Sequence, residues 1–348
     1  MNYKINKQDT YWEIEAEKTV SIQDCCYDVT TNTFVIAVKH NRGSDYVVLN
    51  REHEIVRIVS EDQGLNQNFV LAPDKSVWIC MSALCTKKDG EVVLPLYERE
   101  RVKKEIVKSD LGIDDSFFWD GCHWGYVNDI FGEKPDKLLQ YQFDKKGLYK
   151  TRKTFKLDTL RRARPFVQDN TLYLCQRDFN KGVLQIFKMS EPGKMEEMCE
   201  PLVMKKYEWC QLVNVQEAGY KIIGGVGNEV SMILADRQGK IVEEKLLYRL
   251  NIPDFYSILD FRVSENGVVA FGYATEKQSG IIEIKDSVAK EVFWQKDNVL
   301  YSKNTEIKTK NKFTFHIMSD GKENYYMATN IDVRGGKSRK IYLVDGVQ

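Results

Sequence analysis

A repeat of about 47 residues runs through this chain of 348 residues and constrains its fold more than any other feature. In each repeat a short apolar run, such as DYVVLN, LLQYQF or VSMILA, ends in a polar turn, and a more polar run follows. Consecutive turns begin 45 to 59 residues apart, at Asn50, Glu98, Asp144, Met189, Asp236, Asp286 and Asp345. A period of this length predicts one supersecondary unit that is repeated along the chain.

The apolar runs have the composition of β-strands. They are short, rich in Val, Ile, Tyr, Phe and Trp, and bounded by Gly, Asn, Asp or Lys, while helical periodicity is nearly absent. In six of the repeats a second turn comes before the first one, at Thr31-Asn32, Asp74-Lys75, Asp169-Asn170, Glu217-Gly219, Asn266-Gly267 and Asp320-Gly321. Asn-Gly and Asp-Gly are strong hairpin signals. Each repeat is therefore predicted to hold four antiparallel strands, a to d, with a–b and c–d hairpins.

Four antiparallel strands in each repeat resemble the blade of the β-propeller superfamily, over the whole chain and by strand pattern and period alone. The paired GH and WD of WD40 repeats, the double glycines of kelch repeats and a complete Asp box are missing. The resemblance implies an all-β propeller of seven four-stranded blades in a single domain, 1–348. The expected blades are 20–60, 66–109, 114–157, 163–203, 209–250, 256–296 and 311–348 plus 8–16.

Both ends of the chain are expected to meet in the last blade. The last repeat stops after its third strand, and the segment TYWEIEAE near the N-terminus can supply the missing outer strand. This pairing would close the ring and remove an exposed sheet edge. Six or eight blades remain alternatives, because residues 295–312 form a polar insertion in the final unit.

The charge balance argues against a general attraction to polyanions. Lys and Arg number 51, Asp and Glu also number 51, and the net charge is zero. Any binding of nucleic acid or of an anionic membrane would then need a local patch. The N-terminus has no apolar core of signal-peptide type, and no apolar run approaches the ~20 residues of a membrane span. We expect a soluble, cytoplasmic chain with no membrane attachment.

The eight cysteines are expected to be reduced thiols. Several lie in apolar strand-like runs such as VWIC and LYLC, and no CxxC occurs. A chain of this size needs no disulfide framework, and structural zinc needs four converging ligands. The four histidines are scattered over different repeats. The prediction is therefore no metal and no cofactor.

The stretch FFWDGCHW, residues 117–124, looks at first like an active site. One repeat on from the turn at 74–75, or one back from the turn at 169–170, lies Asp120-Gly121. The stretch is therefore predicted to be the end of strand a, a tight turn and the start of strand b. Alternation along a strand puts Cys122, Trp124 and Tyr126 on one face, where they would pack between blades. We interpret the stretch as scaffold.

Function is expected on the face made by the d–a and b–c connections, by analogy with propellers in general. These connections mix acids, arginines and aromatic residues, a combination that suits polar ligands. The candidate ligand-binding residues are Asp24, Asn68, Asp114, Arg161, Arg164, Arg177, Glu208, Trp209, Tyr256 and Asp260.

The predicted function is a non-catalytic scaffold that binds a protein or peptide partner through this face, since no catalytic constellation is evident. The alternative is a carbohydrate-active enzyme, similar to glycoside hydrolases, in which two of Asp24, Asp114, Glu208 and Asp260 act as acid and base on a glycan. A weaker hypothesis is nucleic-acid binding by the basic segment 144–164, with Tyr149 and Phe155 interleaved. The positive charge of that segment is better explained if it forms an outer strand, where charged side chains keep the sheet edge from pairing with other chains.

Overall fold

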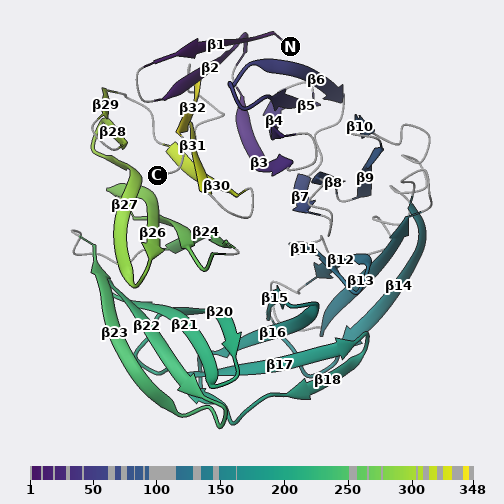
Figure 1. Cartoon of the computed structure of the whole chain (residues 1–348), viewed down its shortest axis with the longest axis vertical. Coiled ribbons are helices and arrows are strands. Elements are labelled where there is room, and N and C mark those ends of the chain that lie inside the picture. Colours follow the sequence, from purple (N-terminus) through teal and green to yellow (C-terminus); the bar gives the residue numbers. More distant parts are fainter. Residues whose placement is uncertain are drawn as a thin grey trace. The chain divides into compact units, whose positions relative to one another are not determined.

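Every element in the described part of the computed structural model is a β-strand (Figure 1). No helix there has the length and apolarity needed to cross a membrane. The structure describes residues 2–8, 11–18, 20–28, 32–40, 43–61, 67–71, 77–81, 83–88, 91–93, 115–127, 135–143, 149–161, 163–250, 257–264, 266–275, 277–302, 305–308, 313–319, 324–330 and 340–344.

Within these residues the strands form seven antiparallel sheets, numbered here in chain order. Sheet 1 contains β3 (Ser21–Asp28), β4 (Thr33–His40), β5 (Gly43–Leu49) and β6 (Ile55–Glu61). Sheet 2 contains β7 (Gln67–Leu71), β8 (Val77–Met81), β9 (Ala83–Lys88) and β10 (Glu91–Val93). Sheet 3 contains β11 (Asp115–Trp119), β12 (Cys122–Val127), β13 (Asp136–Phe143) and β14 (Tyr149–Leu157).

The later sheets follow the same order of neighbours, and three of them carry extra strands. Sheet 4 contains β15 (Arg164–Gln168), β16 (Thr171–Asp178), β17 (Val183–Glu191) and β18 (Lys194–Glu197), with β19 (Leu202–Val203) also paired to β17. Sheet 5 contains β20 (Trp209–Gln216), β21 (Gly219–Val226), β22 (Glu229–Asp236) and β23 (Ile241–Arg249). Sheet 6 contains β24 (Ser257–Val263), β25 (Val269–Ala274), β26 (Gln278–Lys285), β27 (Val288–Lys296), β28 (Val299–Ser302) and β29 (Thr305–Lys308). Sheet 7 contains β30 (Phe313–Ser319), β31 (Asn324–Asn330), β32 (Lys340–Val344), β2 (Trp12–Ala16) and β1 (Tyr3–Lys7).

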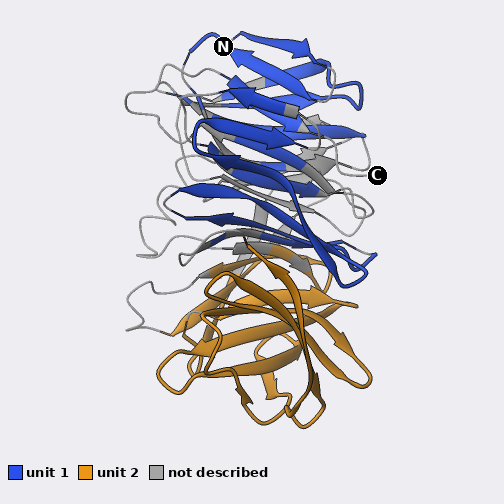
Figure 2. Ribbon diagram, turned by 90° about the vertical axis from the view of Figure 1, so that its left-hand side faces the viewer, with its two compact units in different colours: residues 1–67, 251–348 blue, residues 68–250 orange. Residues whose placement is uncertain are grey.

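The chain divides into two compact units, coloured separately in Figure 2. Unit 1 is residues 1–67 and 251–348, and unit 2 is residues 68–250. Sheets 1, 6 and 7 therefore belong to unit 1, and sheets 2 to 5 belong to unit 2, apart from the first residue of β7. Each unit is described by itself.

The hairpin turns at 120–121 and 169–170 lie where the sequence predicted them, whereas the predicted turns at 74–75 and 320–321 lie outside the described residues. Asp120 and Gly121 have φ values of 50° and 66° between β11 and β12, and Asp169 and Asn170 have values of 48° and 54° between β15 and β16. Positive φ at both central residues is the type I′ pattern that matches the twist of a two-residue hairpin. At Asp236 the carboxylate accepts hydrogen bonds from the N–H groups of Gln238 and Lys240, which fixes a c–d turn.

The interpretation of FFWDGCHW as scaffold is confirmed. Trp124 and Tyr126 are fully buried, and Cys122 packs against the same apolar cluster. The indole N–H of Trp124 donates to the Trp119 carbonyl at 2.9 Å. The side chain of His123 lies outside the described residues.

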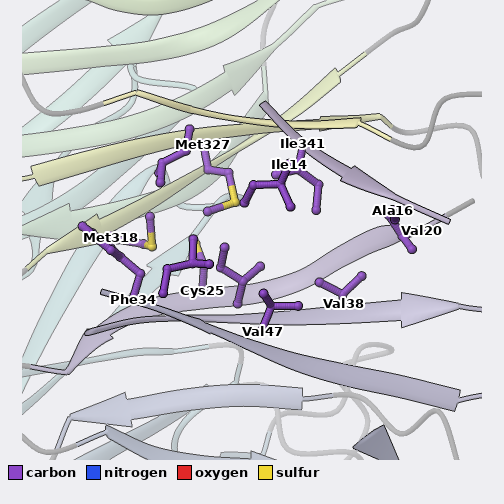
Figure 3. Packing of buried hydrophobic residues seen from close by; sticks show 13 residues of the cluster. Ile14, Ala16, Val20, Cys25, Phe34, Val38, Val47, Met318, Met327 and Ile341 are labelled. Carbon is purple, nitrogen blue, oxygen red and sulfur yellow. The ribbon is translucent and has the colours of Figure 1, made fainter. Parts of the chain in front are cut away.

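The core of unit 1 draws on both ends of the chain (Figure 3). Ile14 on β2 and Ile341 on β32 meet Cys25, Phe34 and Val47 of sheet 1, together with Met318 and Met327 of sheet 7. Strand β2 pairs with β32, and Lys340 Nζ lies 2.9 Å from Glu13 Oε1. The N-terminal segment thus adds a strand to the last sheet, and β1 adds one more than predicted.

Two apolar clusters hold sheets 3, 4 and 5 of unit 2 together. Trp119, Trp124 and Leu138 of sheet 3 pack with Leu174 and Phe187 of sheet 4. On the other side of sheet 4, alternating residues of β16 pack against sheet 5, a cluster that includes Tyr173, Cys175, Leu212, Tyr220 and Ile222. Alternation along β16 therefore gives each neighbouring sheet its own set of side chains.

The polar insertion at 295–312 is a structured extension of sheet 6. Strand β28 pairs with β27, and β29 pairs with β28. Leu300 is fully buried and joins a cluster with Phe293 and Phe315. The short apolar run from Val299 to Tyr301, in a mainly polar segment, was too weak a signal to predict these strands from the sequence.

The described cysteines are free thiols, as predicted. Cys25 and Cys175 are buried, and Cys122, Cys199 and Cys210 are partly buried. Burial raises the pKa of the Cys175 thiol, because an apolar environment disfavours the thiolate.

Candidate functional site

Arg177 lies at the end of β16 and holds the connection that leads from sheet 4 to sheet 5. Its Nη2 donates to the carbonyls of Met204 and Tyr207, at 2.7 and 2.6 Å. Its Nη1 lies 3.7 Å from Cys210 Sγ on β20. Arg177 follows Cys175 by two residues, so alternation points it toward sheet 5. The planar guanidinium can donate to several acceptors at once, and here it fixes a loop.

A glycine allows that connection to lie close to the b–c turn of sheet 4. Gly182 has a φ of 66°, and a Cβ at this position would come within 2.6 Å of Lys205 Cγ. The N–H of Met204 donates to the Gly182 carbonyl at 2.7 Å, and the N–H of Gly182 donates to the Asp178 carbonyl at 2.8 Å. The turn and the connection are therefore joined by backbone hydrogen bonds.

An exposed aromatic ring stands on this joined structure. Phe179 is 70% exposed, and the Arg177 guanidinium carbon lies 5.6 Å from the centre of its ring. Val203 on β19 is 60% exposed and pairs with Val183, which follows the same turn. Contact of large apolar side chains with water is unfavourable, so exposure on this scale is a feature of binding surfaces. We call Phe179, Val203, Lys181 and Lys205, with Arg177 beneath them, the Phe179 platform.

A second arginine reaches the same sheet junction from β15. Arg164 is exposed, and its Nη1 lies 3.4 Å from Gln211 Oε1 on β20. Alternation places Trp209 on the same side of β20 as Gln211. Burial raises the pKa of the Cys210 thiol, and the positive charges of Arg177 and Arg164 oppose that rise. Both guanidinium groups are therefore close to one point of β20.

The acidic side chains near the platform are largely engaged. Glu208 Oε2 accepts a hydrogen bond from the N–H of Gly227 at 3.1 Å and so holds the β21–β22 turn. Asp178 lies 3.6 Å from Lys181, and Glu244 pairs with Lys206. Hydrogen bonds from the Lys206 and Tyr207 side chains lower the pKa of Glu244 against the opposing effect of burial.

The neighbouring junction, between sheets 3 and 4, is held by a carboxylate. Asp136 is fully buried and accepts hydrogen bonds from the Tyr126 hydroxyl and from the N–H of Ala163, the latter at 3.0 Å. The N–H of Arg161 donates to Gln176 Oε1 at 2.7 Å. The Arg161 Nη1 donates to the carbonyls of Asp158 and Leu160.

The structure brings together five of the ten predicted site residues, all at the junctions on either side of sheet 4. These are Arg161, Arg164, Arg177, Glu208 and Trp209. Arg177 and Arg161 are used largely for internal hydrogen bonds, which corrects the expectation that they face a ligand freely. Arg164 and the edge of the platform remain open to solvent.

The other five predicted residues carry no description of their side chains. Asp114 and Tyr256 lie outside the described residues. Asp24, Asn68 and Asp260 were predicted in d–a connections, and this placement is wrong: they lie within β3, β7 and β24. Each of the two aspartates directly follows a bulge, at Ile22/Asp24 and at Ile258/Asp260. An extra residue breaks the alternation of a strand, so the start of the strand was not evident from the pattern.

Phe179 was missed from the sequence. It lies in DFNKG between β16 and β17. The available signal was a large apolar residue in a turn, where no strand alternation accounts for it. The basic segment 144–164 loses one of its proposed stacking residues, because Phe155 packs against the cluster that contains Trp124. In the described part of the chain, no three His, Cys, Asp or Glu side chains gather in a way that could hold a metal ion.

This succession of antiparallel sheets along the chain is the pattern of a β-propeller fold, as the strand pattern predicted. The chain is similar to an oligogalacturonate lyase in complex with manganese, with a TM-score of 0.54 and 11% identity over 100% of this chain and 96% of that one. The β-propeller domain of the Trilobed protease from Pyrococcus furiosus has a TM-score of 0.49 and 11% identity, over 95% and 97% of the two chains.

The WD40 domain of Toxoplasma gondii coronin is a further similar structure, with a TM-score of 0.49 and 10% identity over 100% of this chain and 87% of that one. Identities this low show the fold alone. No family model matches the chain, and no curated protein matches it either.

Proposed function

We propose that this chain is a non-catalytic β-propeller scaffold that binds a protein or peptide partner through the Phe179 platform. In this proposal the seven sheets are seven blades of one ring, and the pairing of β2 with β32 closes it. The observation that carries the proposal is the exposure of Phe179 on a turn that is held by hydrogen bonds from both sides. A rigid, exposed aromatic side chain is a frequent anchor of protein interfaces.

The scaffold loses little entropy when it binds. Arg177 and Gly182 already fix the turn and the connection that carry Phe179 and Val203. A preorganised surface avoids the ordering of loops that weakens association. The same rigid arrangement has no evident catalytic purpose, because the guanidinium of Arg177 is directed at backbone carbonyls.

The glycan alternative receives less support. It needs two carboxyl groups about 5–10 Å apart at one surface. Glu208 is the candidate acid whose side chain is described, and its carboxylate holds the N–H of Gly227. The similarity to an oligogalacturonate lyase concerns the fold alone.

Affinity capture from the source cells tests partner binding. The full-length chain should retain a stoichiometric protein partner, and the Phe179→Ser variant should lose at least about tenfold of it. Val242→Ser is the matched control, because Val242 is an exposed apolar residue of the same unit, on β23. Equal capture by all three forms, or no partner with any of them, would refute the proposal.

A further inference from the structure

We propose that the partner presents an acidic peptide segment in which carboxylates flank one apolar side chain. This inference rests on the proposed function, because it takes the Phe179 platform as the contact surface and adds the chemistry of what binds there. Two independent features of the surface lead to it: an exposed aromatic side chain, Phe179, and positive charges that have no carboxylate partner among the described residues.

The apolar part of the surface can take one side chain of the partner. Phe179 and Val203 expose 70% and 60% of their surfaces, from two segments joined by the hydrogen bond between Met204 N–H and the Gly182 carbonyl. The Arg177 guanidinium supports the Phe179 ring from within. An aromatic or aliphatic side chain packed on the Phe179 ring would remove it from water.

The positive and negative side chains near the Phe179 platform do not balance. Lys181 is paired with Asp178, and Lys206 is paired with Glu244. Arg164, Arg177 and Lys205 have no ion pair with a carboxylate among the residues that the structure describes. Glu208 is the nearby acid left over, and it is held by a backbone N–H. Two exposed cations without a carboxylate partner, Arg164 and Lys205, therefore stand against one exposed carboxylate, in a chain whose net charge is zero.

The positions of the cations favour a peptide over a single anion. Lys205 is exposed at the platform, with its side-chain stem against Gly182, whereas Arg164 reaches out from β15 beside Gln211. Arg177 is half-buried, and its guanidinium is committed to two backbone carbonyls. Carboxylates spaced along a segment can meet these separate charges while the apolar side chain covers Phe179.

The test measures binding of short fluorescent peptides to the full chain at low salt. The probe is a peptide of Glu and Gly with one central Trp. One comparison peptide has Lys at each Glu position, another has Gly in place of Trp, and a single-stranded oligo-dT tests for a general affinity for polyanions. The variants are Phe179→Ser, Lys205→Glu and Arg164→Glu. Val242→Ser and Lys240→Glu, both in exposed parts of sheet 5, are the controls.

We expect the Glu–Trp peptide to bind and the Lys peptide not to bind. Phe179→Ser and Lys205→Glu should each weaken binding about tenfold, Arg164→Glu somewhat less, and the controls not at all. Affinity should fall severalfold as salt rises to about 0.5 M, since exposed charges are screened. Equal binding of the two charged peptides, binding of oligo-dT alone, or unchanged binding by Lys205→Glu would overturn the inference.

The two proposals fail in different ways. If affinity capture returns a partner that Phe179→Ser loses, but neither salt nor Lys205→Glu weakens that partner, the scaffold function stands and the acidic partner does not. If no partner is captured and no peptide binds, both proposals are wrong.

Discussion

Two connections between neighbouring sheets of unit 2 are each held by one charged side chain, and the two charges have opposite signs. Asp136 holds the connection from sheet 3 to sheet 4 by accepting from the Tyr126 hydroxyl and the Ala163 N–H. Arg177 holds the connection from sheet 4 to sheet 5 by donating to the carbonyls of Met204 and Tyr207. Both side chains hold a connection between neighbouring sheets, but their surroundings differ.

The different surroundings of Asp136 and Arg177 follow from the hydrogen bonds that a carboxylate and a guanidinium can make. A carboxylate is an acceptor and is satisfied by donors that approach its two oxygens, so Asp136 is completely enclosed. A guanidinium donates in its plane and leaves its faces free for an aromatic ring. The Phe179 ring lies over Arg177 and is exposed. The acidic junction is therefore enclosed, whereas the basic junction carries an exposed aromatic ring, which we propose as a binding surface.

The largest effect is expected from breaking the acidic junction. Asp136→Ala leaves a buried tyrosine hydroxyl and the Ala163 N–H without their acceptor, which should cost about 3 kcal/mol of unfolding free energy. Denaturant unfolding followed by tryptophan fluorescence measures it, since Trp119 and Trp124 lie in sheet 3. The exposed Asp158→Ala is the control, with a change of at most about 0.5 kcal/mol. A similar loss for both variants would contradict the role of Asp136.

The basic junction should be less costly to break, because its acceptors lie nearer to solvent. Arg177→Ala should destabilise the chain by about 2 kcal/mol, and Arg177→Lys by about half of that, since an ammonium cannot place two donors in one plane. Both variants should also weaken binding at the platform, because the Phe179 ring loses its support. Unfolding curves and peptide binding, measured on the same samples, test both expected losses. Full stability in Arg177→Ala would show that backbone hydrogen bonds alone hold the connection.

The thiols beside Arg177 predict a smaller, pH-dependent effect. Burial raises the pKa of Cys175 in the folded chain, and the unfolded value is about 8.5. Below that value the thiol is protonated in both states, so its contribution to stability is complete. As pH rises above it the unfolded thiol loses its proton first, and stability falls by about 1 kcal/mol between pH 8 and pH 9.5.

Unfolding curves across this pH range measure the loss for Cys175. Cys175→Val should remove this part of the pH dependence while leaving the curve at pH 7 nearly unchanged. An identical alkaline loss in Cys175→Val would assign the effect to other groups.

The smallest effect on stability is expected from replacing Phe179, although the same replacement should strongly weaken binding. Phe179 is largely in water, so Phe179→Ser should change the free energy of unfolding by no more than about 0.5 kcal/mol. Phe155→Ser provides the contrast, since Phe155 packs against Trp124 and its loss should cost about 2 kcal/mol or more. Thermal unfolding of the two variants separates a surface aromatic from a packed one. A large loss for Phe179→Ser would mean that the ring is part of the fold.

Much of the architecture could be predicted from local patterns. The turn at Asp120-Gly121, the burial of Trp124 and Tyr126 and the strand from 8–16 all follow from alternation, turn chemistry and the period of the repeat. Asp24 and Asp260 were misplaced in connections, although the expected blades begin at 20 and 256, because a bulge interrupts the alternation just before each of these residues. The two strands of 299–308 were also missed, since the short apolar run from Val299 to Tyr301 is a weak signal in a mainly polar segment.

The sequence by itself determined the class of fold, because strand alternation and hairpin turns are local properties that repeat at a regular period. It also marked Arg164 and Arg177 as candidates by placing them in the d–a and b–c connections, whereas the structure puts them at the start of β15 and near the end of β16. Only the tertiary structure decided that Arg177 binds carbonyls 27 and 30 residues further along the chain, and that Phe179 stands exposed above it. Backbone carbonyls are common to all residues and leave no trace in the sequence, so the partner of a guanidinium becomes known when the sheets are packed together.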